Sequence, residues 1–325
     1  MTVLLATGFE HGTHEILPAA YYSGVQADAS AAHTGSYGLD INPATSGSRY
    51  WVVPFTATST IYASFWWQPV NITLNNTLFV NTLLGSTSQC GIYLSNTLLW
   101  SALRGGSTSL ATASFPLPDY GWHHYKLYIH IDNVSGRVKL DVDSINLIDF
   151  TGDTQPATPS TIDRIYFGAN GARCYLDDLI LDDSQNWVDV RFNGLIPNSD
   201  VTTDWTPSTG STHYTLVDEV PYDDADYLET NTDAQQEIYG LTDWTGTNKT
   251  PQMTVTWVRA LKTTADTQKL KLIVKSGATT DVGAAQDVFT TATYLSRIDE
   301  TDPNTGVAWT DSGIDAMQIG YESEI

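Results

Sequence analysis

Residues 121–143, GWHHYKLYIHIDNVSGRVKLDVD, carry the clearest structural signal in the chain. From residue 123 to residue 131, apolar and polar side chains alternate, as is typical of a half-buried β-strand. The apolar face of this strand comprises Tyr125, Leu127, Ile129 and Ile131. Residues 132–136, DNVSG, are turn formers, and the alternation resumes over 137–143. We therefore expect a β-hairpin here.

The same kind of pattern runs through most of the chain. Short alternating segments are separated by clusters of Gly, Asn, Asp, Pro and Thr, and long helical patterns are almost absent. Further strands are expected at 60–69, 162–167, 174–181, 187–192, 253–261, 270–274 and 316–321. The predicted fold class is all-β, built from sandwich-like or barrel-like sheets.

Composition limits the classes of function. Only 16% of the residues are charged, against about 25% in typical soluble proteins. The 37 acidic and 15 basic residues give a formal net charge of −22, which repels phosphate backbones and argues against direct binding of nucleic acid. The 10 Trp, 17 Tyr and 9 Phe residues are ample material for hydrophobic cores, so a disordered chain is not expected.

A chain of 325 residues suggests about two domains. The pattern changes near residue 185, with 15 acidic and 7 basic residues up to that point and 22 and 8 after it. We predict one domain over 1–184 and a second β-rich domain over 185–325, which begins with an acidic, loop-rich stretch. No low-complexity linker separates the two.

Neither a membrane span nor a secretory leader is expected. No segment approaches 18 consecutive apolar residues, and the first residues, MTVLLATG, lack a basic start. Synthesis in a cytosol follows as an expectation. The two cysteines, Cys90 and Cys174, are then expected to be buried free thiols rather than a disulfide.

Six short motifs in the first domain match one known pattern. They are GFE at 8–10, HTGSYGL at 33–39, ASFWW at 63–67, GWHHY at 121–125, VDS at 142–144 and YLDDL at 175–179. Together they resemble the laminin-G-like or concanavalin-A-like jelly roll, with Ser144 where the family usually has glycine. The resemblance implies two antiparallel sheets packed back to back, and many functions share this fold.

The second domain resembles segments found behind such jelly rolls in structural proteins of tailed bacteriophages. The resemblance is carried by residues 193–227 and by 302–321, which include DPNTGVAWT and IDAMQIGY. It implies a structural component of the virion, made in the host cytoplasm, that contacts major capsid or tail proteins. A homo-oligomer is also implied, with a trimer expected at a symmetry axis of the particle.

Two kinds of function are compatible with this resemblance. The first is a capsid decoration or head-fibre protein, because the chain lacks the heptads and β-helix repeats of a fibre shaft; a tail or baseplate position stays open beside it. The alternative is a tail or baseplate adhesin that binds host polysaccharide. Aromatic rings can stack on sugars, and the candidates in strand ends or loops are Trp51, Trp100, Tyr21 and Tyr22.

Sequence signs of catalysis are scarce. The chain contains no P-loop, no Gly-x-Ser-x-Gly and no His-Glu-x-x-His motif. The Glu-x-Asp-x-x-Glu run of glucanases with this fold is absent as well. We therefore expect a protein that is not an enzyme and has no organic cofactor.

Acidic residues gather at two places where calcium could bind. Asp177 and Asp178 precede a second acidic pair at 182–183, and a later loop holds Asp218, Glu219, Asp223 and Asp224. Calcium prefers oxygen ligands, and like charges this close repel each other unless they are neutralised. A solvated acidic surface and a surface that meets a basic neighbour remain open as alternatives, since neither spacing is that of an EF-hand.

Overall fold

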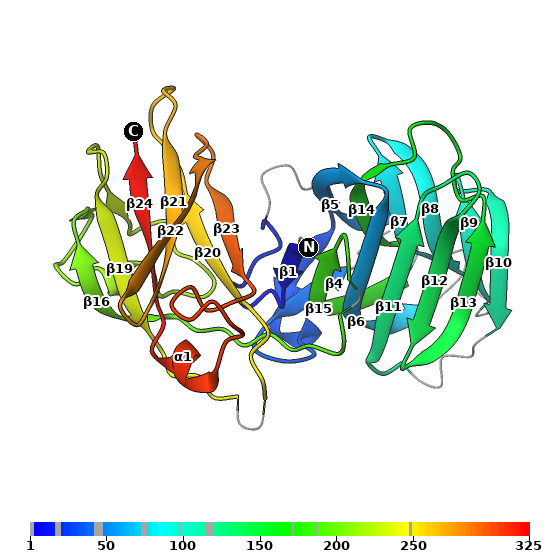
Figure 1. Cartoon of the computed structure of the whole chain (residues 1–325), viewed down its shortest axis with the longest axis horizontal. Helices are drawn as coiled ribbons and strands as arrows, with labels where there is room; N and C mark the ends of the chain where they lie inside the picture. The colour runs from blue at the N-terminus through cyan, green and yellow to red at the C-terminus, as the bar shows by residue number, and fades with distance from the viewer. Residues whose placement is uncertain are drawn as a thin grey trace. The chain divides into compact units, whose positions relative to one another are not determined.

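The computed structural model describes residues 3–16, 21–41, 48–72, 77–95, 97, 99–114, 120–170, 172–185, 187–246 and 249–325, without the side chains of Tyr21, Ser48, Asn71, Ile72, Thr77, Leu78, Phe79 and Asn170. Two compact units make up the chain, and strands dominate both (Figure 1). The first unit comprises Met1–His14 and Ala19–Phe192, and the second comprises Glu15–Pro18 and Asn193–Ile325.

The first unit is an antiparallel jelly-roll sandwich, which confirms the predicted fold class. Sheet I contains, in the described residues, β13 (Ile145–Gly152), β12 (Gly136–Val142), β11 (His123–His130), β6 (Thr60–Ile72), β15 (Ala172–Asp182), β4 (Gly38–Ile41) and β3 (Val25–Asp28) in this order, with β1 (Val3–Thr7) paired to β15. Sheet II contains β10 (Thr108–Ser114), β9 (Leu99–Arg104), β8 (Thr87–Leu94), β7 (Thr77–Leu84), β14 (Ile162–Asn170), β5 (Ser48–Thr58) and β2 (Tyr21–Ser23). A short 3-10 helix, Ala29–Ala31, connects β3 to β4.

The hairpin expected at 121–143 is confirmed as β11 and β12. Its register pairs Tyr125 with Val142 and Ile129 with Val138, and the predicted apolar face is fully buried. At the next turn, Asp143 and Ser144 have φ angles of 49° and 69°. Two positive φ angles are what a two-residue type I′ hairpin turn requires, so the turn forms although Ser144 replaces the usual glycine.

The core of the first unit lies between the inward faces of the two sheets. Phe65 of sheet I packs edge-on against Phe167 of sheet II at 5.3 Å between ring centroids. Trp100 of sheet II lies 5.9 Å from Tyr125 of sheet I. The cysteines Cys90 and Cys174 are buried free thiols, as expected, and burial raises the pKa of each to about 12.

The first unit extends past the predicted boundary at residue 184. Residues 187–192, expected as the first strand of the second domain, form no strand and belong to the first unit. Their side chains and backbone bond to sheet I through Trp66 and Asp178. Alternation of apolar residues in this segment therefore reflects docking onto an existing sheet rather than a new strand.

The second unit is smaller and also β-rich. Sheet III contains β16 (Pro197–Thr203), β19 (Gln236–Leu241), β24 (Gln318–Glu324), β21 (Lys269–Ser276) and β22 (Thr279–Asp287) in the described part of the chain. Two further antiparallel pairs are β17 (Thr206–Pro207) with β18 (Leu228–Glu229), and β20 (Thr254–Ala260) with β23 (Thr293–Asp299). A 3-10 helix at Tyr214–Leu216 and the helix α1 at Asp311–Asp315 complete the elements.

Two apolar clusters form the core of the second unit. One contains Tyr239, Leu270, Leu272, Val288, Leu295 and Tyr321, and the other Val274, Trp309, Ile314 and Met317. The strands expected at 253–261, 270–274 and 316–321 are all present. No helix within the described ranges is long and apolar enough to cross a membrane.

Candidate functional site

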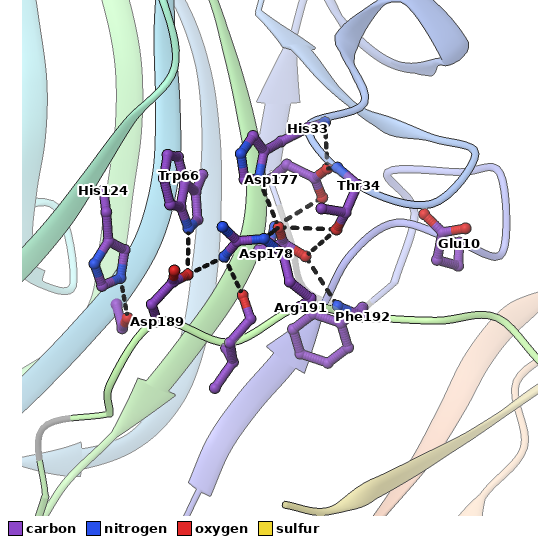
Figure 2. A network of polar contacts seen from close by, with 12 residues as sticks. Glu10, His33, Thr34, Trp66, His124, Asp177, Asp178, Asp189, Arg191 and Phe192 are labelled. Atoms are coloured by element: carbon purple, nitrogen blue, oxygen red, sulfur yellow. Dashed lines mark hydrogen bonds and ion pairs between the residues drawn. The ribbon is translucent and has the colours of Figure 1, made fainter. Parts of the chain in front are cut away.

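The first calcium candidates, Asp177 and Asp178, lie on β15 and are almost completely buried. Figure 2 shows them at the centre of a polar network. Asp178 accepts hydrogen bonds from Thr34 Oγ1 at 2.9 Å and Phe192 N at 3.0 Å, and lies 2.9 Å from His33 Nδ1. Asp177 accepts from the backbone N–H groups of His33 at 2.7 Å and Thr34 at 3.2 Å. The two carboxylates therefore tie the loop at 33–34 to the last strand of the sandwich.

The segment 187–192 closes over the same place, around the ring of Trp66. His33 stacks on Trp66 at 3.9 Å between centroids, and the guanidinium carbon of Arg191 lies 4.4 Å from the centroid of the same ring. Trp66 Nε1 donates to Asp189 Oδ1 at 2.8 Å, and Arg191 pairs with the same carboxylate. Arg191 Nε also lies 3.8 Å from Asp178 Oδ2, so its charge faces the buried pair (Figure 2).

The electrostatics of this network follow from burial. Removal from water, and then the neighbouring Asp178 carboxylate, raise the pKa of Asp177 to about 9, although three N–H donors act in the opposite direction. Burial also lowers the pKa of Arg191. Glu10, whose carboxylate accepts from Ser36 N at 2.9 Å, has a pKa raised by burial. A buried charge without a partner would destabilise the folded protein, so the hydrogen bonds among these side chains and backbone groups are needed to keep them buried.

The geometry does not fit a cation between Asp177 and Asp178. Their oxygens already accept N–H and O–H donors, and Arg191 and His33 place positive or donor groups where calcium would need free oxygen ligands. Among the described residues, no group of three or more His, Cys, Asp or Glu side chains is arranged to hold a metal ion. The hydrogen bonds and ion pairs of this network hold the segment 187–192 against sheet I.

A second feature of this face is the buried pair of Ser64 and His124. Ser64 Oγ lies 2.9 Å from His124 Nε2, and the Val188 carbonyl lies 3.5 Å from the same hydroxyl. Burial, with smaller contributions from Lys126 and Arg191, lowers the pKa of His124 to about 4. The imidazole is therefore neutral in the folded protein at neutral pH.

This lowered pKa predicts a pH dependence that a His124→Asn variant should reduce. Between pH 6.5 and 4 the unfolded chain takes up a proton at His124 and the folded chain does not, so stability falls as the pH falls. The titration of His124 lowers the free energy of unfolding by about 3 kcal/mol at most over this pH range. Urea unfolding at several pH values measures it. Ser64→Ala, which keeps the imidazole, should retain the wild-type slope; an equal slope in His124→Asn would contradict the assignment.

The second set of calcium candidates lies in a loop of the second unit and comprises Asp218, Glu219, Asp223 and Asp224. Asp224 accepts hydrogen bonds from two guanidinium nitrogens of Arg259 on β20, Nε and Nη2, each at 2.8 Å. Arg259 in turn lies 3.6 Å from the ring centroid of Tyr222. Asp223 accepts from Ala225 N at 2.8 Å. Asp224 is therefore used to anchor the loop to the sheet.

The other carboxylates of this loop repel one another. Burial, together with Asp226, Asp218 and Asp223, raises the pKa of Glu219. A raised pKa shows that crowding disfavours the charged form. Beside Glu219, the Oδ1 atom of Asp226 is buried and has no hydrogen-bond partner among the described residues. Calcium at this loop remains a proposal.

The four predicted glycan-binding aromatics divide into three groups. Trp51 and Trp100 are fully buried between the sheets, which corrects the prediction for both, since an enclosed ring cannot stack on a sugar. Tyr22 is 46% exposed and packs edge-on against His14 at 4.4 Å. The side chain of Tyr21 lies outside the described residues.

Sequence reasoning missed a group of tyrosines on the outward face of sheet II, Tyr50 of β5, Tyr93 of β8 and Tyr166 of β14, here called the tyrosine surface. Each neighbours a core residue in sequence, and the alternation of a strand turns it to the opposite face. The rings of Tyr50 and Tyr166 are stacked at 5.1 Å with an interplanar angle of 29°. All three side chains are partly exposed.

Two glycines allow these rings to lie along the sheet. A Cβ at Gly168 would come within 2.2 Å of the Tyr166 ring, and one at Gly91 within 3.0 Å of the Tyr93 ring. Each glycine is two residues from its tyrosine on the same strand face, so the ring occupies the space that a side chain would fill. Burial, Tyr50 and Tyr93 raise the pKa of Tyr166 to about 12, so its phenol stays neutral at ordinary pH.

Comparisons with known proteins identify no family. No protein-family model and no curated protein matches the chain. Among solved structures, a Bacillus subtilis protein of unknown function with a galectin-like fold has 11% identity and a TM-score of 0.44, covering 57% of this chain and 98% of that one. An endo-β-1,4-glucuronan lyase from Trichoderma reesei has 12% identity and a TM-score of 0.39, covering 56% and 96%.

A sialidase matches with 11% identity and a TM-score of 0.41 over 56% of this chain, and the match spans only 19% of the sialidase. The expectation that the protein is not an enzyme is contradicted by these comparisons, because sialidases and polysaccharide lyases are among the structures that match. Matches at this level assign no activity to this chain. Nothing in them indicates a phage virion protein, so that expectation gains no support here.

Proposed function

We propose that the first unit binds carbohydrate chains through the tyrosine surface of sheet II. The observation that supports this proposal is the placement of the Tyr93 and Tyr166 rings over Gly91 and Gly168, which presents aromatic faces on an otherwise regular sheet. Pyranose rings carry C–H groups on one side that pack against an aromatic face, whose electron density is negative. Rings that lie along a sheet are suited to this contact.

The surroundings of the rings supply hydrogen-bonding groups for sugar hydroxyls. Ser101 lies beside Tyr93 in the register of β9 and is partly exposed, whereas Asn81 beside Tyr166 is buried and already accepts from Ser88. Tyr166 and Tyr93 are on strands separated by one other strand and are offset by two residues in register, which places their Cα atoms roughly 12 Å apart. This spacing is about the length of two linked sugar rings in an extended chain. The surface therefore fits a chain rather than a single sugar.

The proposal predicts that loss of the rings weakens binding. We expect Tyr166→Ala to weaken binding to a polysaccharide about tenfold and the Tyr93→Ala/Tyr166→Ala variant about a hundredfold, because each stacked ring contributes more than about 1 kcal/mol. Affinity electrophoresis and titration calorimetry on a panel of polysaccharides measure the effect. Tyr166→Phe, which keeps the ring, should retain most of the affinity.

A matched control lies on the opposite sheet. Tyr62 of β6 and Tyr128 of β11 form a comparable pair, with ring centroids 4.6 Å apart. Tyr62→Ala should bind as the wild type does, with near-ultraviolet circular dichroism verifying that each variant is folded. Equal losses in Tyr62→Ala and Tyr166→Ala, or binding that survives the double variant, would contradict the proposal.

The virion setting expected from the sequence is a separate proposal, supported by the resemblance of residues 193–227 and 302–321 alone. In that setting the tyrosine surface would recognise host polysaccharide from a capsid or tail position. Immunogold labelling of purified particles with antibodies to this chain tests it, and unlabelled particles would count against it.

A further inference from the structure

The strands of sheet II differ in charge from the rest of the chain. They contain Arg49, Arg104, Arg164 and a single acidic residue, Asp163. The whole chain has 37 acidic residues and a net charge of −22. The strands of sheet I, by contrast, hold aspartates at 28, 40, 141, 149, 177, 178 and 182. Acidic groups are therefore almost absent from the sheet that carries the tyrosine surface.

Two of the three arginines of sheet II are paired with aspartates, and the third is at an inward position. Arg164 is the one charged side chain at an outward-facing register position among its described strand residues, and its Nε pairs with Asp163 Oδ1 at 2.9 Å. Arg104 pairs with Asp153. Arg49 is at an inward position, opposite Ala169, and its Nη1 donates to Ser23 Oγ at 3.2 Å. Within the described strands of sheet II, the outward face thus combines aromatic rings and neutral polar groups with one cation, Arg164, which is paired with Asp163.

We propose that the ligand of the tyrosine surface is an uncharged hexopyranose polymer rather than one that contains uronic or sialic acids, an inference that rests on the proposed function. A carboxylate that stacks against the rings would lose water without gaining a cationic partner, which is unfavourable. The net charge of −22 further repels an approaching polyanion. A neutral sugar chain has no carboxylate to desolvate and is not repelled by the negative charge of the protein.

Polygalacturonate and its carboxyl-reduced form test whether the ligand is neutral or acidic. They share linkage and length, and the reduced form has a neutral hydroxymethyl group in place of each carboxylate. Alginate and carboxyl-reduced alginate provide a second pair. We expect the reduced polymers to bind at least about tenfold more tightly at low salt. Raising NaCl from about 0.05 to 0.5 M should leave the affinity for the reduced polymers unchanged within about twofold, since no ion pair is screened. Tyr166→Ala should weaken the binding of the reduced polymers about tenfold.

Two other outcomes separate the inference from the proposed function. Tighter binding of the native uronates, weakened by salt and by Arg164→Gln and also weakened in Tyr166→Ala, would overturn the inference and leave carbohydrate binding in place. Binding of none of the four polymers, nor of neutral glucans and mannans tested beside them, would overturn the proposed function and the inference together.

Discussion

Replacement of Asp178 by alanine is expected to lower the free energy of unfolding of the first unit by about 3–5 kcal/mol, because a buried carboxylate with several partners is lost. Asp178 accepts hydrogen bonds from Thr34 and from the backbone of Phe192, and it faces the charge of Arg191. Its φ angle is 51°, and alanine in this left-handed region costs about 1 kcal/mol more. The variant should therefore release the segment 187–192 as well as destabilise the sandwich.

Urea unfolding followed by tryptophan fluorescence measures the change, and protease cleavage within 187–192 reports the release of the segment. Asp178→Asn should lose less stability, because asparagine tolerates the left-handed region and keeps one acceptor oxygen. Asp149→Ala is the matched control: Asp149 forms an exposed pair with Arg137, whose loss should cost less than about 1 kcal/mol. A loss no larger in Asp178→Ala than in this control would show that the network does not hold the segment.

The elements of the fold that depend on local pattern could be predicted from the sequence. The hairpin of β11 and β12 is the best example, since alternation and a turn-forming DNVSG segment are both visible within 21 residues. The same reasoning failed at 187–192, which alternates like a strand. In that segment, contacts with Trp66 and Asp178 determine the structure, and neither residue is close in sequence.

The candidate sites were harder to predict because their partners are distant in sequence. His33 and Thr34 meet Asp178 across 144 or more residues, and the sequence alone offered two acidic residues that could be solvated or bind calcium. Among the predicted aromatics, Trp51 and Trp100 face the core. Trp51 is next to Tyr50, and a shift of one residue exchanges the core side of a strand for its outer side. The useful signal was a glycine two residues from a tyrosine, as in Tyr166 and Gly168.

A buried carboxylate also organises the second unit, and its loss should have an effect of similar size. Glu237 of β19 is fully buried. It accepts hydrogen bonds from Trp205 N at 2.7 Å and Tyr239 OH at 3.0 Å, and it lies 3.0 Å from His213 Nδ1. The Tyr239 hydroxyl lies 3.0 Å from that of Tyr321, so the carboxylate ends a buried chain of polar groups. Burial and these neighbours raise the pKa of Tyr239 far above its ordinary value.

Glu237→Ala removes the carboxylate that Trp205 N, Tyr239 OH and His213 contact, and we expect a loss of about 3–5 kcal/mol in the stability of the second unit. Glu237→Gln keeps one acceptor oxygen and should lose less, although its amide group would face the same donors. Thermal unfolding followed by circular dichroism measures both. Glu324→Ala provides the control, since Glu324 pairs with Lys271 and is 40% exposed. Stability of Glu237→Ala equal to that of Glu324→Ala would mean that water replaces the lost oxygen, and that the apolar clusters alone hold this unit together.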